Sequence, residues 1–338
     1  MPTDRTPPRQ RVDTVPAGAA VTALLDRLGR IPSQRRDFRI GEREALSRYG
    51  LAPTLLHPLL ELGFPARTED GAYSYDAADL VNLSLQLRRG ALSRALTRFW
   101  PRALSALTGP GPAGYRVGHQ AACPEPDRPG HNACEFTVLT PEGERTVQRP
   151  VRADPGPVLE TELWLRTDWP DLPPPMAGVV AEVADLEFMW LPRSLRWDTA
   201  FMRRTGLADC MGVSRLLVEE ARARGLPART AYGLVVAPPY ATHHYWAEAG
   251  VGGDWVPLDP LMIKAMLGWG VLDHREWHPA RSLGGMLCRL AADRTPVVTH
   301  DGVPCASSYP TRGLTPTPAQ DTGAHHSGAP DDNKEDRA

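Results

Sequence analysis

The spacing of apolar residues predicts a helix-rich first part of the chain. Apolar positions recur at helical intervals, and a tight hairpin is predicted between two of the helices, over residues 63–76. The predicted helices lie over residues 19–30, 42–49, 53–62, 77–88 and 91–107. Asp76 is placed to cap the fourth of them, and Pro101 to interrupt or kink the fifth. We therefore expect a mainly helical subdomain over residues 18–107.

The second part of the chain mixes helical and strand patterns. Residues 108–132 are rich in glycine and proline, which is typical of an irregular linker, and residues 134–150 alternate like a β-hairpin. We assign residues 108–155 to this linker and hairpin. Residues 156–310 then read as one catalytic domain, in which a helix from Cys210 is followed by β-rich segments. The expected fold class is α+β.

Both ends of the chain are polar and rich in proline. Residues 1–17 and 311–338 hold few apolar side chains, so we expect both to be disordered. No uncharged apolar run of about 18 residues occurs, and the first residues lack an apolar signal-peptide core. These features predict a cytoplasmic protein without a membrane partner.

The five cysteines, at positions 123, 134, 210, 288 and 305, form no CxxC motif. An odd number without such spacing argues against a disulfide framework and against a zinc site. We therefore expect no bound metal and no cofactor. In a reducing compartment, one of these cysteines can serve as a free thiol nucleophile.

The helical part resembles the winged helix-turn-helix that opens MerR-type regulators, through residues 59–63 and 75–80. That resemblance implies DNA binding. However, this segment has no strong basic stripe and the whole chain carries a net charge of −2. We favour a subdomain that buttresses the catalytic half or shapes its substrate cleft, and we do not expect nucleic acid as a partner.

The candidate chemistry lies between residues 208 and 260. Cys210 opens a helix, where unpaired N–H groups favour a thiolate and could also hold an oxyanion. Strand alternation places His244 on one face and His243 on the other. A glycine-rich turn then returns the chain so that Asp259 can lie beside His244 and orient its imidazole.

Four motifs in this segment resemble the transglutaminase-like core of the papain-like thiol enzymes. They are Asp209-Cys210, Gly225-Leu-Pro-Ala-Arg229, His244-Tyr-Trp-Ala-Glu248 and Trp255-Val-Pro-Leu-Asp-Pro260. The resemblance implies a nucleophile helix packed on an antiparallel sheet. It also implies Cys210 as nucleophile, His244 as general base and acid, and Asp259 as the orienting carboxylate.

The sequence departs from animal transglutaminases in two respects. Met211 follows the cysteine where those enzymes have tryptophan, and no calcium-site cluster is evident. The chain therefore resembles a bacterial branch that forms, exchanges or cleaves amide bonds. We count Asp209, Met211, His243 and Trp246 as supporting residues, since a bulge would exchange the two histidines and Trp246 is expected to pack.

Three functions remain open at this point. The first is acyl transfer through a Cys210 thioester intermediate, from a peptide, amide or thioester donor to an amine or water. A carrier protein or peptide could present the substrate, and a biosynthetic tailoring role is one form of this function. The second is a cysteine peptidase or amidase that uses the same triad. The third is a non-catalytic regulator or scaffold with a winged-helix-like N-terminus.

Overall fold

The computed structural model describes residues 18–108 and 111–315. Its central feature is an antiparallel sheet with the strand order β13-β10-β11-β16-β4-β7, to which β12 adds beside β11. The strands are β4 (Ala113–Ala121), β7 (Gly156–Leu165), β10 (Ala228–Val235), β11 (Tyr240–Val251), β12 (Asp254–Leu258), β13 (Leu287–Ala291) and β16 (Ser307–Leu314). Together with the helices beside it, this sheet confirms the α+β fold class.

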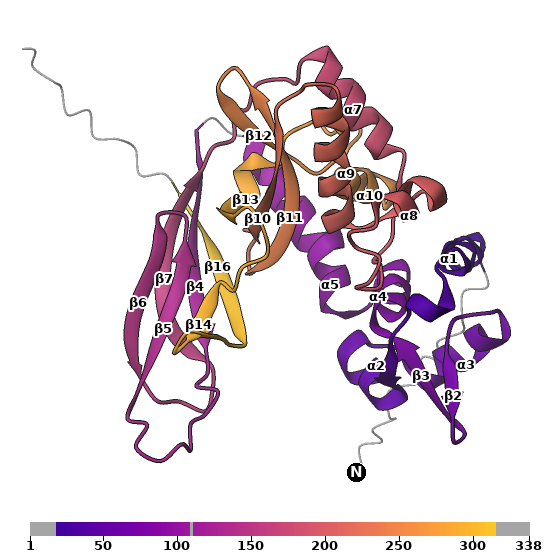
Figure 1. Ribbon diagram of the computed structural model, residues 1–338, viewed down its shortest axis with the longest axis horizontal. Helices are drawn as coiled ribbons and strands as arrows, with labels where there is room; N and C mark the ends of the chain where they lie inside the picture. Colours follow the sequence, from indigo (N-terminus) through magenta and orange to yellow (C-terminus); the bar gives the residue numbers. More distant parts are fainter. Residues whose placement is uncertain (1–17, 109–110, 316–338) are drawn as a thin grey trace, which may run out of the picture.

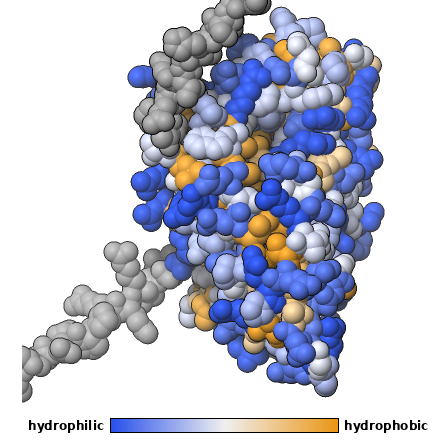
Figure 2. Space-filling model, turned by 90° about the vertical axis from the view of Figure 1, so that its left-hand side faces the viewer, coloured by the Kyte–Doolittle hydropathy of each residue, from blue (hydrophilic) through white to orange (hydrophobic). Residues whose placement is uncertain are grey.

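A smaller four-stranded sheet lies beside β4 and β7 (Figure 1). It consists of β5 (Ala133–Thr140), β6 (Gly143–Pro150), β14 (Val298–His300) and β15 (Val303–Pro304). Strands β5 and β6 form the hairpin that the sequence predicts. Buried residues from both sheets share one hydrophobic cluster, which joins them into a β-rich lobe. The face of the molecule seen in Figure 2 is largely hydrophilic, with separate apolar patches.

Strand β4 corrects the expectation of an irregular linker. Its burial alternates from Tyr115 to Ala121, as in a strand with one face in the core. The glycines that suggested a linker serve close packing instead. A Cβ on Gly114 would lie 2.5 Å from the Trp164 ring, and one on Gly118 would lie 3.3 Å from Pro310. Residues 311–314, which we expected to be disordered, belong to β16, whereas residues 1–17 and 316–338 lie outside the described residues.

Four helices accompany the catalytic part of the sheet. They are α7 (Pro174–Ala184), α8 (Thr199–Thr205), α9 (Cys210–Ala223) and α10 (Pro260–Gly268). The buried face of α9 packs against β10 and β11 through Val213, Leu216, Leu217 and Ala221. Short β8 (Glu187–Phe188) and β9 (Leu207–Ala208) pair in parallel just before this helix. Helix α9 lies between the sheet and α7 (Figure 1).

The N-terminal part folds as helices around a three-stranded sheet of order β1-β3-β2. Its elements are α1 (Ala19–Gly29), β1 (Phe38–Gly41), α2 (Glu42–Tyr49), α3 (Pro53–Glu61), β2 (Arg67–Glu69), β3 (Ala72–Asp76), α4 (Ala77–Gln86), α5 (Gly90–Arg94) and α6 (Trp100–Ser105). Asp76 caps α4 as predicted, accepting a hydrogen bond from the Ala78 N–H at 2.7 Å. Short helical turns complete the chain at Ser33–Arg35, Ala95–Phe99, Ala106–Thr108 and Gly284–Met286, the second of them a π-turn.

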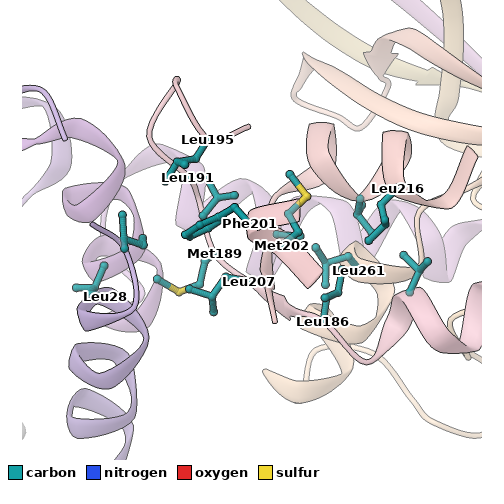
Figure 3. Packing of buried hydrophobic residues seen from close by; sticks show 14 of the residues in the cluster. Leu28, Leu186, Met189, Leu191, Leu195, Phe201, Met202, Leu207, Leu216 and Leu261 are labelled. Atoms are coloured by element: carbon teal, nitrogen blue, oxygen red, sulfur yellow. The ribbon is translucent and has the colours of Figure 1, made fainter. Parts of the chain in front are cut away.

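The helical subdomain and the second half of the chain share a continuous core. One buried cluster runs from Val21 of α1 to Leu261 of α10. Figure 3 shows Leu28 of α1 on the side of Met189 and Leu207, which belong to the same cluster. Contacts of this kind join the helical subdomain to the β8–β9 segment that precedes α9. No helix in the two described stretches has the length and apolar character needed to cross a membrane.

Candidate active site

Asp209 fixes the start of the helix that carries Cys210. Its Oδ1 atom accepts a hydrogen bond from the Gly212 N–H at 3.0 Å, and its Oδ2 atom lies 3.4 Å from the Arg196 guanidinium. Burial raises the pKa of Asp209 to about 6, although Arg196 and backbone N–H groups favour its charged form. Cys210 is the first residue of α9 and is partly exposed. The cap therefore holds the thiol at a fixed, accessible helix end.

The same cap corrects one expectation about the oxyanion. The Gly212 N–H donates to the Asp209 carboxylate at 3.0 Å, and the Val213 N–H donates to the Asp209 carbonyl at 2.9 Å. These two donors are occupied within the helix end, so neither belongs to the anion site that the sequence suggested for the residues after Cys210.

Strand β11 and the turn into β12 bring His244 and Asp259 together. The two strands pair antiparallel, with Ala247 opposite Leu258, so Asp259 emerges beside the histidine. His244 Nε2 lies 2.6 Å from Asp259 Oδ2, and both side chains are buried. Asp259 Oδ1 accepts a second hydrogen bond from the Met262 N–H at 2.9 Å, which caps α10. One carboxylate thus orients the histidine while the backbone fixes its own position.

The thiol completes this arrangement from the opposite side of the imidazole. The Cys210 side chain lies within interaction range of His244 and favours the charged form of the imidazole. Since Nε2 bonds Asp259, the ring nitrogen left for the sulfur is Nδ1. Burial disfavours the imidazolium, but the Cys210 thiolate and the Asp259 carboxylate outweigh it and raise the pKa of His244 to about 10. The three residues named from the sequence as a triad are therefore in mutual contact through His244.

His243 points away from this group. It pairs with Leu234 while His244 pairs with Gly233, and the register of β10 and β11 continues through both without a bulge. The His243 Nε2 atom lies 3.0 Å from the Tyr309 hydroxyl, and its ring also contacts Tyr232. These contacts indicate that His243 is a structural residue on the opposite face of the sheet.

The remaining supporting residues surround the triad without joining it. The Trp246 ring is buried and stacks near the His244 ring at a centroid distance of 6.5 Å. Its Nε1 donates to the buried Glu248 carboxylate at 3.4 Å, and Glu248 in turn pairs with Arg229 at 2.6 Å. Met211 is half-buried beside Cys210 in the first turn of α9. The tryptophan therefore packs, as the sequence predicts.

Two residues of this site were not identified from the sequence. Trp100, from the helical subdomain, lies with its ring centroid 5.6 Å from that of His244. Arg196 connects Asp209 to the ring of Trp190, with its guanidinium carbon 5.3 Å from the ring centroid. Neither residue belongs to the four motifs, and no spacing in the sequence relates them to Cys210.

A cavity of about 420 Å³ lies between the helical subdomain and the loop before α8. Its walls include Tyr49, Val81 and Gly90 on one side, and Trp190 and Arg196 on the other. Because Arg196 also pairs with Asp209, this cavity adjoins the helix end that carries the thiol. A larger cavity, of about 630 Å³, is lined by α6, β4 and Pro238–Pro239. No triad residue lines either cavity.

Comparison with known proteins agrees with this geometry. Residues 191–260 match the family model of the Transglutaminase-like superfamily. A crystal structure described as "a Putative Cysteine Protease from Cytophaga hutchinsonii" shares 12% sequence identity and covers 61% of this chain and 92% of its own, with a TM-score of 0.31. Structural similarity at this TM-score is too low to support a conclusion about this chain. A search of curated proteins found no match.

The matched segment begins before Cys210 and ends just after Asp259, so it contains the whole of the proposed triad. The family match supports a cysteine-based enzyme as the class of protein. Residues 191–260 of this chain are therefore similar to the Transglutaminase-like superfamily.

Proposed function

We propose that this protein is a thiol-dependent acyltransferase that forms or exchanges an amide bond through Cys210. The observation that carries the proposal is the contact of His244 with both the Cys210 side chain and the Asp259 carboxylate. A nucleophile, a base and an orienting group in that order are what acyl transfer by a thiol requires. The raised pKa of His244 also supports its role as a proton donor to the leaving group.

The reaction then proceeds in two balanced steps. The Cys210 thiolate attacks the carbonyl carbon of an amide or thioester, and the imidazolium of His244 gives its proton to the departing amine or thiol. This leaves an acyl thioester on Cys210 and a neutral His244. An acceptor amine attacks the thioester, His244 takes its proton, and the new amide leaves as the Cys210 thiolate reforms.

The choice between amine and water as acceptor depends on access to that thioester. His244 is 7% exposed and Asp259 is 1% exposed, and Trp100 covers one edge of the histidine. These contacts keep water away from the base and its orienting carboxylate, whereas Cys210 itself is partly exposed and can be reached by an acceptor. We propose an amine as that acceptor, with hydrolysis by a peptidase or amidase as the alternative.

Intact mass spectrometry of the full chain tests the proposal. Incubation with small thioester and amide donors should add one acyl group to the wild type and none to Cys210→Ala. Cys305→Ala is the matched control, because Cys305 lies near the end of the smaller sheet, and it should acylate like the wild type. An adduct that survives Cys210→Ala would contradict the mechanism.

A second arm separates transfer from hydrolysis. The acylated enzyme is mixed with a primary amine, and the released product is identified by mass. An amide product supports the acyltransferase. Release of the free acid alone, at every amine concentration, would instead identify a cysteine hydrolase with the same triad.

We also propose that the cavity beside Arg196 receives part of the substrate, which gives the helical subdomain its role. Trp190→Ala should then raise KM with little change in kcat, because it removes a wall of the cavity and leaves the triad intact. Trp164→Ala is the control, since Trp164 is an exposed residue on β7. An unchanged KM in Trp190→Ala would place the substrate elsewhere.

A further inference from the structure

Four side chains with metal-binding chemistry meet in the β-rich lobe. Cys123 follows β4, His131 lies in the loop before β5, Cys134 belongs to β5, and His300 ends β14. One sulfur or ring nitrogen from each residue lies within 4.8 Å of all the others. Cys123, Cys134 and His300 are buried, and His131 is partly buried.

The separations agree with the edges of a tetrahedron. Cys123 Sγ lies 3.2 Å from His131 Nε2 and 3.8 Å from His300 Nε2, and Cys134 Sγ lies 3.4 Å from His131 Nε2. Zinc binds sulfur at about 2.3 Å and nitrogen at about 2.0–2.1 Å, so the edges of its tetrahedral sites measure roughly 3.3–3.8 Å. These three of the six donor separations are therefore close to those of one tetrahedral ion, and all six lie within 4.8 Å.

The donor set selects the metal by its chemistry. Two thiolates and two imidazoles are the ligands of structural Zn²⁺ sites, whereas Mg²⁺ and Ca²⁺ prefer oxygen. Two thiolate charges also neutralise a divalent ion, which allows the site to be buried beside Phe136. Four protein ligands leave no open position for water, so the site is structural.

The surroundings of the two histidines are compatible with coordination through Nε2. Asp301 Oδ2 lies 3.6 Å from His300 Nδ1, just beyond hydrogen-bond distance and on the side where a carboxylate can orient a metal-bound histidine. Arg128 Nη2 lies 2.8 Å from His131 Nδ1. Once metal binding places a proton on that nitrogen, Arg128 turns toward Glu125, with which it already pairs at 2.9 Å.

We propose that Cys123, His131, Cys134 and His300 bind one Zn²⁺ ion, which fastens the β4–β5 loop and β14 to the start of β5. This proposal differs from the expectation of no metal site. That expectation relied on the missing CxxC motif, but His300 comes from a distant part of the chain and reaches the cluster only because β14 pairs with β5. The site contains none of the triad residues and is independent of the proposed acyl transfer.

Metal analysis of the purified full-length chain is the first test. The wild type should contain about one zinc per chain, and Cys134→Ser and His300→Gln should each lower this roughly tenfold. Cys305→Ser is the matched control, because Cys305 lies in the same lobe outside the cluster and should leave the zinc content unchanged. Wild type purified with zinc present but free of metal would overturn the proposal.

Cobalt substitution is the second test. It uses the wild type alone, so it does not require any variant to fold. Wild type stripped with a chelator and titrated with Co²⁺ should show thiolate charge-transfer bands and the intense visible bands of tetrahedral cobalt. The chelated protein should also unfold at a lower temperature and recover on addition of Zn²⁺. A weak octahedral spectrum, or a Cys123–Cys134 disulfide found by mass after alkylation, would contradict the assignment.

Discussion

The indole ring of Trp100 lies edge-on to the imidazole of His244, with the ring planes at 77°. Trp100 begins α6 of the helical subdomain, whereas His244 lies in the central sheet. The indole is 4% exposed, and its Nε1 has no hydrogen-bond partner within residues 18–108 and 111–315. The ring therefore contributes shape and apolar contact to the histidine, so the helical subdomain forms one wall of the proposed catalytic group.

This contact predicts different outcomes for two substitutions of Trp100. Trp100→Ala leaves a cavity against His244 and should cost about 3–5 kcal/mol in the free energy of unfolding, with a loss of kcat. Trp100→Phe keeps an aromatic ring there and removes an unpaired N–H, so both losses should be much smaller. Denaturant unfolding and steady-state kinetics measure the two effects. Equal activity in wild type and Trp100→Ala would refute the role of the ring.

We expect the protein to lose activity even when Asp259 is replaced by the similarly shaped asparagine. The carboxylate uses one oxygen for His244 and the other for the Met262 N–H. An amide has one oxygen, so either the histidine or the helix cap loses its acceptor. We expect kcat/KM to fall by roughly 10²–10⁴-fold in Asp259→Asn.

The matched control for this prediction is Asp198→Asn. Asp198 caps α8 by accepting one hydrogen bond from the Phe201 N–H, and asparagine performs that role as well as aspartate. Its kcat/KM should equal that of the wild type. If Asp259→Asn also retained full activity, the carboxylate would not be the orienting group.

The two adjacent histidines should differ sharply in their effect on catalysis. His244→Gln removes the proton carrier and should reduce kcat by roughly 10²–10⁴-fold. His243→Ala removes the contact with Tyr309, which should cost about 1 kcal/mol of stability and leave kcat nearly unchanged. Parallel kinetics and thermal unfolding of both variants test this. The reverse order of activities would make His243 the base.

The pH dependence of the site follows from the pKa of His244. Thiolate and carboxylate raise that pKa from its usual value of about 6.5 to about 10. A raised pKa means that the imidazolium persists through neutral pH and is lost only as pH rises through about 10. NMR titration of the His244 ring should show this step, and Asp259→Asn should move it to lower pH. A wild-type step near pH 6.5 would contradict the ion pair.

The sequence predicts those parts of the site whose geometry is local. Asp209 and Cys210 start α9 because a capping side chain and a helical pattern lie next to each other. His244 and Asp259 meet because a short hairpin connects their strands. In both cases fewer than about 20 residues determine the geometry, so spacing and periodicity are sufficient.

Contacts between distant segments could not be predicted in this way. Trp100 reaches His244 through the packing of a whole subdomain, and His300 reaches Cys123 through a sheet register. Strand β4 was missed for a related reason: its glycines make room for Trp164 and Pro310, which approach from other strands. Information of this kind lies in tertiary packing and has no local periodicity.

The pairing of β16 determines when the central sheet can be completed during synthesis. This strand, Ser307–Leu314, bonds to β11 on one edge and to β4 on the other. Ribosomal synthesis runs from the N-terminus, so β4 and β11 both emerge before the strand that joins them. Until residue 314 is free, the histidine-bearing strand and the β-rich lobe each present an open sheet edge that another chain can pair with. The nascent protein is therefore most exposed to misassembly immediately before β16 is added.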